Sequence, residues 1–233
     1  MKKELKTEQK EYSLKGSCLW GLLLFGVLLL VDMLTKIFAD AYFSQPDAPE
    51  RVAIIPEYLE LCIARNRGIS FSMGSTATPA AKIGLIVATC VMFVAIGWYY
   101  FKTDKRRTWV RVALVLIVAG GIGNLIDRVY YRVWDPASFP AGVRDMVRLK
   151  IFIFDFGVCN FADFFIVGGA IVLILAILFF DGAAMFPLTK KYKALAEEER
   201  AKEDAKEAEK SKKAAEKARE KAAARQENQE KKE

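Results

Sequence analysis

Four long stretches of the chain are almost entirely apolar, namely residues 16–39, 80–101, 109–126 and 161–180. Each is close to the roughly 20 helical residues that cross the hydrocarbon core of a bilayer. The pattern therefore predicts four transmembrane helices, and we expect a membrane protein of the all-α class.

The stretch 51–71, which lies between the first two apolar segments, has a different pattern. β-Branched, aromatic and other apolar residues alternate there in part with polar ones: Val52, Ile54, Ile55, Tyr58, Leu59, Leu61 and Ile63. Partial alternation of this kind indicates strands. We expect a small extracytoplasmic β-rich element resting on the membrane interface, with an ordinary interfacial loop as the alternative.

The C-terminal end of the chain is highly charged. Ala, Glu, Lys and Arg dominate residues 194–233, with opposite charges at helical spacing and almost no apolar stripe. This composition predicts a solvated helical tail rather than a nucleic-acid contact. We divide the chain into a cytoplasmic leader 1–15, a four-helix membrane domain 16–186 and a charged cytoplasmic tail 187–233.

The orientation of the helices follows from Lys and Arg, which are retained on the cytoplasmic side of membrane proteins. A lysine cluster near the N-terminus and the basic segments 102–107 and 190–193 all fall on one side of a four-helix topology. Both termini are then cytoplasmic, and two larger connections, 40–79 and 128–160, face outward.

The second outer connection is itself basic, which runs against this rule. It contains five basic and three acidic residues: Arg128, Arg132, Arg144, Arg148, Lys150, Asp135, Asp145 and Asp155. Anionic lipid headgroups attract basic segments close to the membrane surface. Membrane lipids are therefore an expected partner.

Composition then narrows the chemistry. The chain is 53% hydrophobic and 27% charged, and it contains no histidine. Ser-His-Asp and Cys-His proteases need an imidazole base, and zinc proteases normally bind their metal through histidine. A hydrolase built from this sequence would use carboxylates or a Ser–Lys pair, and the second option has the candidates Ser70, Ser72 and Ser75 with Lys36.

The four cysteines, Cys18, Cys62, Cys90 and Cys159, show no metal-binding spacing. Cys62 and Cys159 both fall on the outer side, so a disulfide is one alternative in an oxidising compartment. Isolated thiols that pack as small hydrophobic groups are the other alternative.

Charged side chains inside membrane segments are costly and therefore indicate function or a specific pairing. Asp32 and Lys36 stand four residues apart in the first apolar stretch, where they share one helix face. A structural ion pair and a direct role in a site both account for them.

The third and fourth apolar stretches carry amides and carboxylates at their outer ends. Asn124 and Asp127 are three residues apart and share a helix face, and so do Asn160 and Asp163. Two such faces at the same depth predict a polar pocket at the outer interface.

At these residues the chain resembles the lipoprotein signal peptidases, also called signal peptidase II. The resemblance covers residues 14–182 and rests on five segments in order: Asp-Met-Leu-Thr-Lys at 32–36, Asn-Arg-Gly-Ile-Ser-Phe-Ser at 66–72, the glycine-rich 120–128, Gly-Val-Arg-Asp at 142–145 and Asn-Phe-Ala-Asp at 160–163.

The resemblance implies an aspartic endopeptidase of the bacterial inner membrane, with its active site near the outer face. It removes the signal peptide from diacylglyceryl-modified prolipoproteins by cleaving on the amino side of the lipidated cysteine. Asp145 and Asp163 match the catalytic aspartates of that family. No metal or other cofactor is implied, and we expect a monomer whose catalytic part is the membrane domain 16–186.

The same resemblance implies substrate-binding or supporting roles for eight further residues: Asp32, Lys36, Asn66, Gly68, Asn124, Asp127, Arg128 and Asn160. Two nearby carboxylates cannot both ionise easily, so a pair of this kind shares one proton and can provide both a base and an acid.

One motif departs from the family pattern. The usual Val-Val-Asp-Phe element reads Val-Arg-Asp-Met at 143–146, and the connection that precedes it is long. Asp155 is the alternative first aspartate, and Asp135 lies in the same connection. A Ser–Lys membrane protease and a non-enzymatic membrane scaffold are the rival functions.

Overall fold

The computed structural model describes residues 14–68, 76–104, 107–152, 154–181, 184–186 and 190–230. Within these residues four helices are long and apolar enough to cross a membrane. They are α1 (Leu14–Phe43), α2 (Pro79–Lys102), α3 (Thr108–Tyr130) and α4 (Phe161–Leu175), which a π-helical segment, η2 (Ala176–Phe180), continues. The four predicted spans are confirmed, and α1 continues past the predicted end of its span to Phe43.

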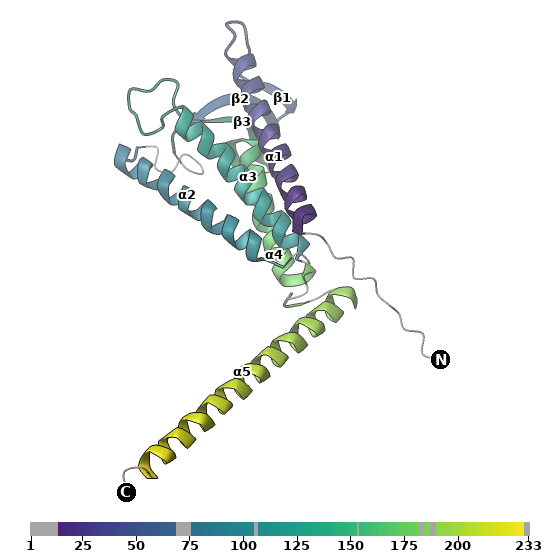
Figure 1. Cartoon of the computed structure of the whole chain (residues 1–233). Coiled ribbons are helices and arrows are strands. Elements are labelled where there is room, and N and C mark those ends of the chain that lie inside the picture. The colour runs from purple at the N-terminus through teal and green to yellow at the C-terminus, as the bar shows by residue number, and fades with distance from the viewer. Residues whose placement is uncertain are drawn as a thin grey trace. The chain divides into compact units, whose positions relative to one another are not determined.

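A four-stranded antiparallel sheet completes the fold, with strand order β1-β2-β3-β4 (Figure 1). The strands are β1 (Val52–Ile55), β2 (Leu59–Asn66), β3 (Val143–Ile151) and β4 (Phe154–Cys159). The small β-rich element is thus confirmed, but half of it comes from a connection for which we predicted no strand. Figure 1 shows the sheet beside the ends of α1 and α3.

Helix α3 is the central helix of the bundle. More than half of its apolar window, 56%, is buried, against 11% for α1 and none for α2. Gly120 lies against the Ala162 carbonyl of α4, and Gly123 lies against the Asp32 carboxylate of α1, so a Cβ at either glycine would clash. Glycine therefore brings α1 and α4 into close contact with α3 where the polar residues lie.

The chain forms two compact units, 1–174 and 175–233. The second contains η2 and α5 (Lys190–Glu230), a 41-residue helix with ion pairs four residues apart, such as Glu198 with Lys202 and Glu209 with Lys213. The functional boundaries that we drew at 15/16 and 186/187 stay a prediction.

Candidate active site

The first turn of α4 holds Asp163 through a reciprocal cap. The Asn160 side-chain oxygen accepts a hydrogen bond from the Asp163 backbone N–H at 3.1 Å, and Asp163 Oδ2 accepts one from the Asn160 N–H at 3.1 Å. The three-residue spacing therefore does more than place both side chains on one face. It satisfies two N–H groups at the start of the helix and fixes both side chains.

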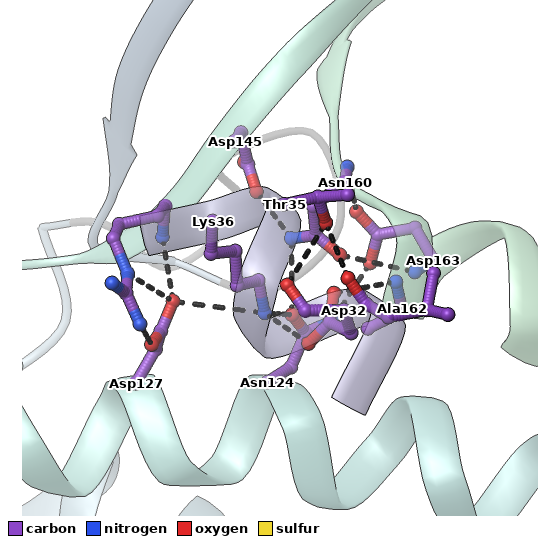
Figure 2. A network of polar contacts seen from close by, with 11 residues as sticks. Asp32, Thr35, Lys36, Asn124, Asp127, Asp145, Asn160, Ala162 and Asp163 are labelled. Atoms are coloured by element: carbon purple, nitrogen blue, oxygen red, sulfur yellow. Dashed lines mark hydrogen bonds and ion pairs between the residues drawn. The ribbon is translucent and has the colours of Figure 1, made fainter. Parts of the chain in front are cut away.

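Two asparagines join the candidate aspartates (Figure 2). Asn160 Nδ2 donates to Asp145 Oδ1 at 2.6 Å and to Asn124 Oδ1 at 3.0 Å. Asn124 Nδ2 donates to Asp163 Oδ1 at 2.8 Å. Asp145 from β3 and Asp163 from α4 thus share one amide network, with Asn124 of α3 at its centre.

Asp145 is almost completely buried, with 3% of its surface exposed. In the sheet, Asp145 is the register partner of Ala64 on β2. Its carboxylate accepts a further side-chain hydrogen bond from Asn66. Burial, followed by the charge of Asp163, raises the pKa of Asp145 to about 7, while the hydrogen bonds from Asn160 and Asn66 act in the opposite direction. Asp145 can therefore carry a proton near neutral pH.

Lys36 and Asp32 form a fully buried ion pair beside this network. Lys36 Nζ lies 2.8 Å from Asp32 Oδ2 and 3.6 Å from Asp127 Oδ2, and it donates to Asn124 Oδ1 at 3.0 Å. Asp32 Oδ1 accepts the Ala162 N–H at 2.9 Å, at the start of α4. This geometry is compatible with both a structural role and a role in the site, because Lys36 also contacts Asn124, which donates a hydrogen bond to Asp163.

Asp127 makes a different set of contacts. Both of its oxygens accept hydrogen bonds from Arg144, which precedes Asp145 on β3. Because its side chain is fully buried and bound in this way, Asp127 connects α3 to the sheet. Arg144 was not among the residues that we singled out as site candidates. The signal that could have identified Arg144 was the arginine in the Val-Arg-Asp-Met element, where the pattern given above has valine.

Arg128 and the segment after β2 form the remaining part of the site. Arg128 Nη2 donates to the Gly68 carbonyl at 3.3 Å, and the Gly68 N–H donates to Asn66 Oδ1 at 2.9 Å. Gly142, with a φ of 133°, lies against the backbone of Arg65 and Asn66, where a Cβ would collide. Glycine there allows the chain to enter β3 beside Asn66.

The other acidic candidates lie outside this network. Asp155 pairs with Arg148 at 3.0 Å, and its side chain is 45% exposed. Asp135 accepts the Ala137 N–H at 2.9 Å within a turn. The candidate nucleophiles Ser70, Ser72 and Ser75 lie outside the described residues.

The cysteines that the structure describes, Cys62, Cys90 and Cys159, are free thiols. Cys159 Sγ donates to the Val147 carbonyl at 3.3 Å. The isolated-thiol alternative therefore describes Cys62 and Cys159, and the disulfide alternative is wrong in this structure. Across the same described ranges, acidic and cysteine side chains form no group of three suited to a metal ion.

The chain is similar in sequence to known lipoprotein signal peptidases. The family model for signal peptidase (SPase) II matches residues 24–179. The lipoprotein signal peptidase of Fusobacterium nucleatum is 30% identical over 71% of this chain and 90% of its own length. The lipoprotein signal peptidase of Staphylococcus haemolyticus is 29% identical over 65% of this chain and 85% of its own length. A 38% identical match to the Chlorobaculum tepidum enzyme covers 43% of this chain and 58% of that protein.

The fold is similar to that of a bacterial membrane enzyme solved by the in meso method. The TM-score is 0.54 and the identity 26%, over 68% of this chain and 87% of the other. The family match over residues 24–179 and the sequence relatives show that the chain belongs to the signal peptidase II family.

Proposed function

We propose that Asp145 and Asp163 are the catalytic pair with which this chain removes signal peptides from prolipoproteins. The activity and the aspartic protease class come with membership of the signal peptidase II family. The observation that supports the pair is that Asn124 and Asn160 join the two carboxylates, which come from different elements.

The chemistry needs one proton on the pair. The ionised carboxylate takes a proton from water as the water oxygen attacks the scissile carbonyl carbon, and the protonated one donates to the developing oxyanion. The C–N bond of the tetrahedral intermediate then breaks as the leaving amine takes the proton that the base removed from water, and a hydroxyl proton of the intermediate returns to the other carboxylate. We assign the acid to Asp145, because burial raises its pKa to about 7, and the base to Asp163.

The surroundings of the pair suit a substrate that is apolar on one side. An apolar groove of about 730 Å³ includes Phe38, Met146, Phe161 and Phe164 in its lining. Met146 follows Asp145 in β3, and the two phenylalanines flank Asp163 in the chain, so the same two elements carry the groove lining and the candidate pair, although neither aspartate lines the groove. It suits the acyl chains of a diacylglyceryl cysteine, with cleavage on the amino side of that residue.

A second cavity, of about 430 Å³, has Asn66 and Asp145 in its lining. A water molecule or a peptide group can therefore reach Asp145 although little of its surface is exposed.

The protein is a multi-span membrane protein of a bacterial lipoprotein-processing family, which places it in the inner membrane. We further propose that both termini are cytoplasmic and that the site faces outward, as the distribution of Lys and Arg predicts. Contacts with membrane lipids and a monomeric state stay part of this proposal.

The rival functions have less support. The Ser–Lys mechanism needs a lysine that activates a serine, but the described contacts of the fully buried Lys36 are with Asp32, Asp127 and Asn124. The non-enzymatic scaffold does not fit membership of a peptidase family.

The decisive experiment measures cleavage of a purified diacylglyceryl prolipoprotein by single variants. Asp145→Asn and Asp163→Asn should each lower kcat by about 100- to 10,000-fold while substrate binding is retained, because an amide keeps the shape but cannot transfer the proton. The double variant should be no worse than the poorer single one.

Asp135→Asn and Asp155→Asn are the controls and should cleave normally. An inactive Asp155→Asn beside an active Asp145→Asn would move the first aspartate to Asp155. Full activity in all four variants would contradict the aspartic mechanism itself.

A further inference from the structure

Arg144 is a buried cation directly before Asp145, and the proposed chemistry does not use it. It is 8% exposed. Its backbone N–H donates to Asp127 Oδ2 at 2.9 Å, its Nη2 to Oδ1 at 2.6 Å and its Nε to Oδ2 at 3.3 Å. Three N–H groups of one residue thus hold both oxygens of a carboxylate. A charge-assisted pair of this forked kind restricts orientation as well as distance.

Arg144 is also connected to helix α1, indirectly, through Tyr131 and Arg65. Its guanidinium lies 5.3 Å from the centre of the Tyr131 ring, and that of Arg65 lies 4.5 Å from the same ring. Arg65 is the register partner of Arg144 on β2, and its guanidinium pairs with Asp40 of α1. Arg144 is therefore bound to Asp127 of α3, and it shares the Tyr131 ring with Arg65 of β2.

We propose that Arg144 is a positioning residue. By fixing the start of β3 to Asp127, it holds the Asp145 carboxylate against Asn160 and so sets its place relative to Asp163. The inference rests on the proposed function of the two aspartates.

The test uses the full-length enzyme in detergent with a purified diacylglyceryl prolipoprotein. Arg144→Met keeps an unbranched stem but removes the charge and the side-chain donors. We expect kcat per folded enzyme to fall by about tenfold or more, toward the roughly 100-fold that a 1 Å misplacement costs, with KM unchanged. Arg144→Lys should recover part of the loss, because one ammonium cannot make both side-chain bonds.

Arg111→Met is the matched control. Arg111 is as buried as Arg144, with 7% exposure, and it also stacks on a tyrosine, with its guanidinium 4.3 Å from the Tyr100 ring centre. It lies on α3 about 24 Å from Asp127 along the helix. This variant should lower the unfolding temperature and leave kcat of the folded enzyme unchanged.

Wild-type kcat in folded Arg144→Met would overturn the inference, and so would a loss expressed only in KM. Should Arg144→Met not fold, Arg144→Lys decides: reduced kcat at unchanged KM supports positioning, and wild-type kcat contradicts it. Asp163→Asn measured in parallel separates the two proposals. If it is inactive while the Arg144 variants are fully active, only the present inference fails, whereas an active Asp163→Asn contradicts the catalytic pair.

Discussion

At the scale of single residues, Asp145 is subject to opposing influences. Burial and the charge of Asp163 favour its protonated form, while hydrogen bonds from Asn160 and Asn66 favour its ionised form. The first two prevail, and the pKa of Asp145 stands at about 7. Below that pH Asp145 keeps its proton, and above it Asp145 can no longer supply the acid of the proposed pair.

The first prediction is a pH profile. We expect kcat to fall above about pH 7, by about tenfold for each further pH unit, because the singly protonated pair is lost. Asn66→Ala removes a hydrogen bond that lowers the pKa of Asp145, so the decline should move to higher pH. Cleavage of the prolipoprotein between pH 5 and 9 measures both effects. A decline that stays in place or moves to lower pH would contradict the role of Asp145 as the acid.

The site residues differ in how far the sequence could predict them. The spacing of Asn160 and Asp163 predicted a shared helix face, and the structure adds a cap between them. Asp145 was reached through the family resemblance, because nothing local separates it from Asp155. What separates them is burial, and burial depends on sheet pairing that the sequence does not display.

At the scale of elements, hydropathy predicted the four helices because the bilayer requires long apolar segments. Strands β3 and β4 were not predicted, since charged residues interrupt β3 at Arg144, Arg148 and Lys150, and β4 is short and contains Asp155. Two of these charges have partners inside the protein, with Arg144 bound to Asp127 and Arg148 to Asp155. In a sequence, a charge that has a partner in the fold cannot be distinguished from a charge in a loop.

The second prediction concerns the link between α1 and α4. Lys36→Met leaves the fully buried Asp32 carboxylate without its cation, which should cost about 3–5 kcal/mol of stability. Asp32→Asn/Lys36→Met removes both charges and keeps an oxygen for the Ala162 N–H, so it should be more stable than the single variant. Thermal unfolding in detergent compares the two.

Activity of the same two variants decides what else Lys36 does. If both fold but lose cleavage equally, Lys36 acts in the site through Asn124 and is more than a counter-ion.

At the scale of the whole molecule, the two compact units differ in chemistry. All the candidate site residues belong to the unit 1–174, whereas α5 consists mainly of Ala, Glu, Lys and Arg. Its described side chains beyond Ala196 are exposed or half-buried, and ion pairs between exposed residues contribute about 0.3–0.5 kcal/mol each. A helix of this kind has no apolar face with which to support a membrane core.

The last prediction is that catalysis does not need α5. A chain that ends after Tyr192 loses nearly all of this helix but keeps the four membrane helices, the sheet and every residue of the amide network. Since no contact in that network reaches beyond Asp163, kcat and KM for the prolipoprotein should stay within about twofold of the full-length values. Membrane insertion is the necessary control, because the truncation removes a charged segment that we propose to be cytoplasmic and to contribute to orientation. Carbonate extraction and gel-filtration of the detergent-solubilised protein measure it. A truncated enzyme that inserts normally and yet fails to cleave would show that α5 takes part in the reaction or in delivery of the substrate.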